Sequence, residues 1–189
     1  VKVLAVVCLL EAGALGAWYC GTYKVPRQVQ LALSAAVLGN EEAGYKLAYN
    51  YFRGHGGDEK FHEDLGKAAY WYEWCIRHGS LDAAVDYAKL LEDGNGFTQD
   101  IPKAIEYLRI GEAAGDPTAL NNMAIHYLIG DYVEQNVPLA IDYFTRAAQA
   151  GIPIAMTNLG AAYRDGVGRE KDPQKAFSYF QMAAQQDEP

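Results

Sequence analysis

The sequence predicts an all-α fold in which antiparallel helix pairs stack into a solenoid. Three observations predict this fold. The first is an internal repeat of a length typical of stacked arrays. Its four copies begin at alanines spaced by 40, 36 and 36 residues: Ala43, Ala83, Ala119 and Ala155. The second is that apolar residues recur at i, i+3, i+4 and i+7, without the alternation typical of strands. The third is that glycine and proline fall at the ends of these segments.

The first helix of each repeat is predicted from the residues that follow the starting alanine. A large apolar residue comes four positions later and a glycine comes eleven positions later. The apolar residues are Leu47, Tyr87, Met123 and Leu159, and the glycines are Gly54, Gly94, Gly130 and Gly166. Because glycine readily adopts the conformations that end a helix, each first helix is expected to end there.

The second helix of each repeat is predicted from its capping residues. Asp and Asn favour the N-cap because their side-chain oxygen accepts an otherwise unpaired backbone N–H. The expected N-caps are Asp64, Asp100, Asn136 and Asp172. Prolines 102, 138 and 173 follow three of them, just inside the helix, where the missing N–H costs nothing. Gly79, Gly115 and Gly151 are expected to end the first three of these helices in a left-handed conformation.

The glycine-rich stretch Gly166-Val167-Gly168, followed by Lys171 and Lys175, has two interpretations. It is either a phosphate-binding loop or a turn between helices. The first glycine occurs in all four repeats, and the second occurs in three, with Tyr132 in its place in the third repeat. The stretch also lacks the order G-x-x-x-x-G-K-[ST] and no strand pattern precedes it, so the sequence favours a turn.

The recurring residues resemble the Sel1-like repeat, a relative of the tetratricopeptide repeat. The frame is A-x-x-x-L-G-x-x-Y-x-x-G-x-G, and the stretch NLGAAYRDGVGREKDPQKAFSYFQMAA comes close to a family consensus. The resemblance implies a right-handed superhelix whose first helices line a concave side. It covers four repeats, residues 43–82, 83–118, 119–154 and 155–189. Departures are Tyr87 and Leu91, Gly111-Glu112 in place of Ala-Ala, and four extra residues in the first turn.

Residues 1–42 allow two interpretations. Lys2, an apolar run and the small residues Ala12-Gly13-Ala14 have the order of a secretory signal peptide. Alternatively, the run is a buried first helix, and residues 15–21 belong to a degenerate partial repeat. The run is too short and too interrupted, by Glu11, for a membrane span, so membrane contact is expected only if it acts as an anchor. Export to the periplasm is favoured, with the cytoplasm as the alternative.

Charge and cysteine usage exclude some functions. The net charge is −8 and no basic stripe is present, so nucleic acid is not an expected partner. Cys8, Cys20 and Cys75 show no C-x-x-C spacing and do not follow the repeat. Three buried thiols are the favoured interpretation, and a disulfide between Cys20 and Cys75 stays open.

The sequence offers little for catalysis or metal binding. His55, Asp58, Glu59, His62, Glu63 and Asp64 crowd the extended turn of the first repeat. Their spacing matches no closed metal site, so a solvated polar loop is favoured and no metal is expected. The few serines stand in no nucleophile motif, and no H-E-x-x-H occurs. We therefore expect neither an enzyme nor a cofactor, and structural roles for His78 and His126.

The candidate binding surface is the concave side that the resemblance implies. Exposed positions of the first helices should fall at −1, +2, +6 and +9 from the starting alanine, and the last three share a helix face. These three positions hold Tyr45, Tyr49, Phe52, Val85, Lys89, Glu92, Asn121, Ile125, Leu128, Thr157, Ala161 and Arg164. All of these except Val85, Thr157 and Ala161 are candidate partner-binding residues. Aromatic and apolar residues beside charges are typical of protein-binding hot spots.

The sequence therefore predicts a non-catalytic module that binds another protein in its concave groove. Proteins that resemble it include bacterial immunity proteins that block a toxic effector, such as a secreted phospholipase, and envelope assembly factors. An immunity role is the first expectation, an envelope scaffold or adaptor the second and an enzyme the third. Binding of chaperone tails is disfavoured, because Tyr49, Ile125 and Ala161 stand where a carboxylate clamp needs asparagine.

Overall fold

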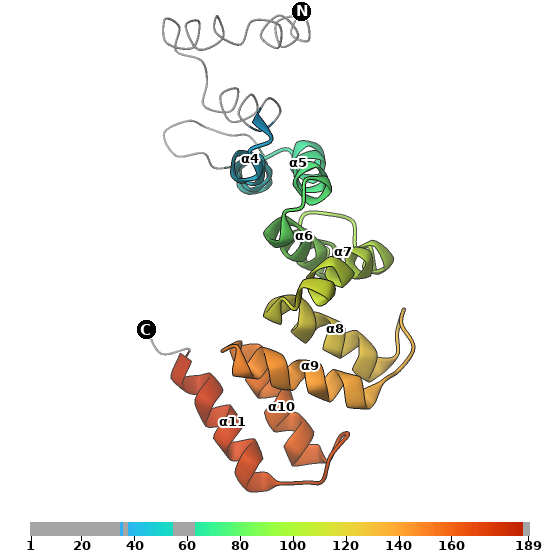
Figure 1. Cartoon of the computed structure of the whole chain (residues 1–189), viewed down its shortest axis with the longest axis vertical. Coiled ribbons are helices and arrows are strands. Elements are labelled where there is room, and N and C mark those ends of the chain that lie inside the picture. The colour runs from blue at the N-terminus through green and yellow to red at the C-terminus, as the bar shows by residue number, and fades with distance from the viewer. Residues whose placement is uncertain (1–34, 36–37, 55–62, 187–189) are drawn as a thin grey trace, which may run out of the picture. The chain divides into compact units, whose positions relative to one another are not determined.

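The computed structural model describes residues 35, 38–54 and 63–186, and in these residues the regular structure is entirely α-helical (Figure 1). The helices are α4 (Glu41–Arg53), α5 (Leu65–Arg77), α6 (Leu81–Asp93), α7 (Ile101–Ala114), α8 (Pro117–Ile129), α9 (Val137–Gln149), α10 (Pro153–Asp165) and α11 (Pro173–Gln186). The chain divides into two compact parts, residues 1–83 and residues 84–189. The predicted order of two helices per repeat is confirmed.

In the first part, α4 packs against α5 as a helix pair. Gly44 lets the two helices approach closely, because a Cβ atom there would lie 2.8 Å from Cys75 Sγ. The ring of Tyr45 meets the ring of Tyr72 edge-on at 6.1 Å. Cys75 is fully buried, and burial raises the pKa of its thiol to about 11. Cys75 is thus a buried thiol, while Cys8 and Cys20 lie outside the described residues.

In the second part, successive helices pack as pairs: α7 with α8, α8 with α9, α9 with α10 and α10 with α11. The starting alanines Ala119 and Ala155 are fully buried, because side chains of neighbouring helices close over them. A continuous apolar core surrounds Phe144, Met156 and Leu159. Burial of this core is the main stabilising contribution, since each repeat covers the apolar face of its neighbour.

The N-cap predictions are confirmed at the second helix of each repeat. Asp64, Asp100, Asn136 and Asp172 each accept the backbone N–H of the residue three positions later. The glycine-rich stretch is a turn from α10 to α11, and Gly166 and Gly168 have φ angles of 76° and 65°. A Cβ atom on Gly168 would lie 2.8 Å from a methyl group of Val137, so this glycine sits against apolar side chains.

The other predictions for the N-terminus lie outside the described residues. These are the signal peptide, the buried first helix and the partial repeat. Most of the candidate metal loop, residues 55–62, also lies outside them. Within the described residues, none of the helices has the length and the apolar character needed to cross a membrane.

Candidate partner-binding groove

A hollow of about 340 Å³ lies between the first helices of the second and third repeats and the start of α10. We call it the groove. Its lining residues are Lys89, Glu92, Asp93, Ile101, Thr118, Asn121, Asn122, Ile125, His126 and Ile154. Six of these ten residues occupy the predicted positions −1, +2, +6 and +9 of their repeats. The predicted positions therefore contribute more than half of the residues that line the groove.

The structure brings four predicted partner-binding residues together in the groove: Lys89, Glu92, Asn121 and Ile125. Leu128 is half-buried against the apolar core of the last two repeats, outside the lining of the groove. Arg164 is exposed, and its guanidinium binds the neighbouring Asp165 carboxylate through two contacts of 2.8 and 2.7 Å.

The other three predicted residues form the aromatic stripe on α4, in the first part of the chain. Tyr49 is the most exposed of them, at 44%, and the Arg53 guanidinium lies 5.7 Å from its ring centre. Tyr45 and Phe52 are half-buried, and Tyr45 contacts Tyr72. The stripe is therefore an uneven surface, with Tyr49 as its most accessible side chain.

Asn121 was predicted to be exposed at position +2 of its repeat, and this prediction is wrong, because only 2% of its surface is accessible. Its side-chain oxygen accepts a hydrogen bond from Asn158 of α10, and its amide donates to Asn122, both at 3.1 Å. Val85 is also buried, at 6%. Asn121 is buried because Asn158 of the neighbouring helix α10 covers its side chain.

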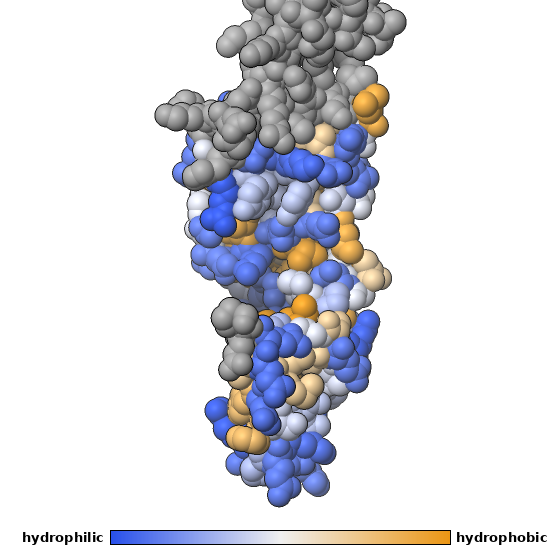
Figure 2. Space-filling model, turned by 90° about the vertical axis from the view of Figure 1, so that its left-hand side faces the viewer, coloured by the Kyte–Doolittle hydropathy of each residue, from blue (hydrophilic) through white to orange (hydrophobic). Residues whose placement is uncertain are grey.

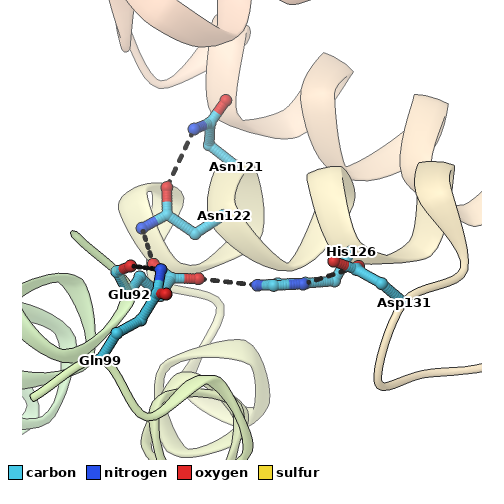
Figure 3. Close-up of polar contacts among 6 residues, drawn as sticks. All are labelled: Glu92, Gln99, Asn121, Asn122, His126 and Asp131. Atoms are coloured by element: carbon cyan, nitrogen blue, oxygen red, sulfur yellow. Dashed lines mark hydrogen bonds and ion pairs between the residues drawn. The ribbon is translucent and has the colours of Figure 1, made fainter. Parts of the chain in front are cut away.

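The asparagines continue into an ionic network on the floor of the groove (Figure 3). The Asn122 amide donates to Glu92 Oε2 at 3.4 Å, and Gln99 donates to the backbone carbonyl of Glu92 at 2.7 Å. The network thus links α6, α8 and α10 through side chains.

His126 is the central residue of this network, and it is 7% exposed. Its Nε2 lies 2.7 Å from Glu92 Oε1, and its Nδ1 lies 3.1 Å from Asp131 Oδ1 (Figure 3). A neutral imidazole has one N–H, so only the protonated ring can donate to both carboxylates. The hydrogen bond with Glu92 raises the pKa of His126, and Asp131 acts in the same direction, while burial opposes them.

This geometry favours the protonated form of His126 and gives its ring a structural role in the network. Both ring nitrogens are occupied by carboxylates, so neither is available to accept a proton from a substrate. Within the described part of the chain, there is also no group of three or more His, Cys, Asp or Glu side chains placed to hold a metal ion.

The pairing of His126 with Glu92 was not predicted from the sequence. The two residues occupy position +7 of one repeat and position +9 of the preceding repeat. At the next repeat boundary the same two positions hold Ala162 and Leu128, which belong to or pack against the apolar core. Polar residues at both of these positions, where the next repeat boundary has two apolar residues, are the signal that could have revealed this contact.

A second polar cluster explains the departure Gly111-Glu112 from the family pattern. The Glu112 carboxylate accepts hydrogen bonds from the hydroxyls of Tyr127 and Tyr143 at 3.1 and 2.8 Å. Burial and this bond raise the pKa of Tyr143 to about 12. A Cβ atom on Gly111 would lie only 2.4 Å from Ala119 Cβ, so glycine is required for the close packing of α7 and α8.

The Sel1 repeat model matches residues 42–73, 81–116, 117–152 and 153–188. The chain belongs to the Sel1 repeat family. Proteins of this family generally mediate protein–protein interactions and are typically non-catalytic. No curated protein matches the sequence significantly.

Solved structures support the same solenoid fold. A protective antigen present in uropathogenic Escherichia coli strains, displaying an SLR fold, is 26% identical with a TM-score of 0.75. A Sel1 repeat protein from Oxalobacter formigenes is 30% identical with a TM-score of 0.69. Each similarity covers 85% of this chain, but only 33% and 45% of those longer chains. Helicobacter pylori cysteine rich protein B, 20% identical over 67% of this chain and 90% of its own, has a TM-score of 0.51 and shares the fold.

Proposed function

We propose that this Sel1 repeat protein is a non-catalytic module that binds another protein in the groove. The observation that carries the proposal is the composition of the groove. Ile101, Ile125 and Ile154 form an apolar wall, and Ile154 is 57% exposed. Lys89 and Asp93 place charges beside this wall. An apolar centre with a charged rim is the arrangement of a typical protein interface.

The polar network supports this proposal because it holds the binding face in one shape. Asn158, Asn121, Asn122 and Glu92 form a continuous chain of side-chain hydrogen bonds across three first helices. A surface that is ordered before binding loses less conformational entropy when a partner docks. The groove is therefore suited to tight binding rather than to a large rearrangement.

The surface also favours separate contacts over one large apolar interface. On the face shown in Figure 2, apolar residues form small patches separated by hydrophilic ones. Small apolar anchors surrounded by polar side chains are typical of specific, non-obligate interfaces. This supports a partner that is recognised by a few anchoring contacts.

Within this function, our first candidate is an exported, periplasmic immunity protein that neutralises a toxic bacterial effector, such as a secreted phospholipase. The family's protein-binding role and the absence of a catalytic arrangement in the groove support it. The net charge of −8 would accelerate association with a basic effector. The second candidate is an envelope assembly scaffold or adaptor, which the same groove supports.

A pull-down from native cells tests the proposal, with Ile154→Asp as the groove variant and Ile110→Asp as its control. Ile110 is 42% exposed on α7, outside the lining of the groove, so both variants place a charge on an exposed isoleucine. We expect the partner to be lost with Ile154→Asp and retained with Ile110→Asp. Equal recovery with both variants would contradict groove binding. A Tyr49→Ala variant tests the aromatic stripe separately.

The same experiment separates the two candidates. An immunity protein should recover one dominant partner in a stoichiometric complex that dissociates slowly. A scaffold should recover several partners more weakly. An activity assay then checks the immunity role, because the purified partner should lose its activity when this chain is added.

A further inference from the structure

Tyr132 occupies a backbone position that favours glycine. Its φ angle is 56°, and it is the only non-glycine residue with a positive φ in the part of the chain that the structure describes. The equivalent residues of two other repeats are Gly96 and Gly168, with φ angles of 78° and 65°. A tyrosine in this left-handed conformation is strained, because its Cβ crowds the following carbonyl group. Such strain persists where the surroundings or the function require it.

The side chain of Tyr132 also changes the packing of its turn. In the fourth repeat, Gly168 lies against Val137 and Ile141, and a Cβ atom there would be 2.8 Å and 2.9 Å from their side chains. A tyrosine at this position cannot pack so closely against the second helix of the preceding repeat. At Tyr132 an open hollow of about 320 Å³ is present instead. It is lined by Pro102, Ile105, Glu106, Arg109 and Tyr132.

Tyr132 is 64% exposed, and its ring contacts no other ring or cation among the described residues. Every other described tyrosine has a ring contact or a cation near its ring. For example, the guanidinium of Arg169 lies 4.3 Å from the ring centre of Tyr163. Tyr132 thus presents an unoccupied aromatic face of the kind that binds cations elsewhere in this chain.

The charges around the hollow favour a cation. Glu106 is exposed and makes no ion pair in the described part of the chain. The other charged lining residue, Arg109, lies 3.7 Å from the Glu112 carboxylate, which offsets its charge. The net charge of −8 adds a long-range attraction for basic molecules.

We propose that this hollow binds a lysine or arginine side chain of a partner protein. The aliphatic stem of that side chain would lie over Ile105 and Pro102, and its cationic group between the Tyr132 ring and the Glu106 carboxylate. Such a contact combines a cation–π interaction with an ion pair. The hollow is formed by α7 and the turn after α8, so this inference does not depend on binding in the groove.

An NMR titration of the ¹⁵N-labelled full chain at 0.15 M NaCl tests the inference, with N-acetyl-arginine amide as the probe. We expect saturable shift changes at the amides of Glu106, Arg109 and Tyr132. N-acetyl-norleucine amide, which has no charge, should give none. Tyr132→Phe should bind like the wild type. Tyr132→Asn, which keeps a residue that tolerates the left-handed conformation, and Glu106→Gln should each weaken binding by about two- to fivefold.

Two outcomes would overturn the inference. Shift changes that are the same in Tyr132→Asn, or that spread over all acidic residues, would show only non-specific charge attraction. The second outcome concerns the stability of Tyr132→Gly in urea. This variant is expected to unfold at a higher urea concentration than the wild type, because the backbone strain at position 132 is removed. A lower unfolding midpoint would show that the ring stabilises the fold, and tyrosine would then be explained without a ligand.

Discussion

Replacing Gly111 by alanine should destabilise the protein, although alanine is the better helix former. Gly111 lies inside α7 and is buried. The equivalent residues of the other repeats are Cys75, Ala147 and Ala183, so the repeat pattern itself suggests alanine as an improvement. A Cβ atom at this position would, however, lie 2.4 Å from Ala119 Cβ and 3.0 Å from Val85 Cγ2. The structure therefore predicts the opposite of the repeat pattern.

The expected magnitude follows from two opposing contributions. Ordinary carbon–carbon contacts lie at about 3.5–4.0 Å, so α7 and α8 would have to separate by about 1 Å. The closest contact involves two Cβ atoms, which no change of rotamer can move. Overpacking of this kind costs about 1–3 kcal/mol or more. Alanine in place of glycine offsets about 1 kcal/mol through helix propensity. Because no rotamer change relieves the contact of 2.4 Å, the cost should lie at the upper end, about 3 kcal/mol, and the net loss should be about 2 kcal/mol.

Urea unfolding followed by circular dichroism at 222 nm measures this change. Gly66→Ala is the matched control, because Gly66 lies in α5, is exposed, and a Cβ there would have no neighbour closer than 3.5 Å. The control should be at least as stable as the wild type, with a gain below the roughly 1 kcal/mol of a helix interior, because Gly66 lies in the first turn of α5. If Gly111→Ala were as stable as Gly66→Ala, the close approach of α7 and α8 would not limit this position, and the reasoning would fail.

Two further predictions concern the polar clusters. The pKa of His126 is raised on folding, so its contribution to stability should be complete below its unfolded pKa, about 6.5, and lost as pH rises through the higher folded pKa. Urea midpoints from pH 5.5 to 8.5 should fall more steeply for the wild type than for His126→Gln, and parallel curves would refute the ionic link to Glu92 and Asp131. Glu112→Gln should lower the pKa of Tyr143 from about 12, because the nearby negative charge is removed. A spectrophotometric titration of tyrosine ionisation at alkaline pH measures this shift, and an unchanged pKa would leave burial as its only cause.

The repeats and the helix ends could be predicted from the sequence, and so could several of the positions that line the groove. Capping by Asp64 or Asn136 acts between residues three apart, so it can be predicted without knowledge of the tertiary structure. Each repeat presents the same position on the same face, which is why Lys89 and Ile125, both at position +6, could be placed on one surface.

Three features could not be predicted from the repeat pattern: the burial of Asn121, the ion pairs of His126 and the need for glycine at position 111. Asn121 is covered because Asn158, 37 positions away in the sequence, lies on the first helix of the next repeat. The pKa of His126 is raised because Glu92 faces it across a repeat boundary. Gly111 is required only because α8 passes so close. These features depend on pairs of residues that depart from the repeat together. A pattern built from what the repeats share contains no signal for such pairs, because their energies arise only when neighbouring helices pack.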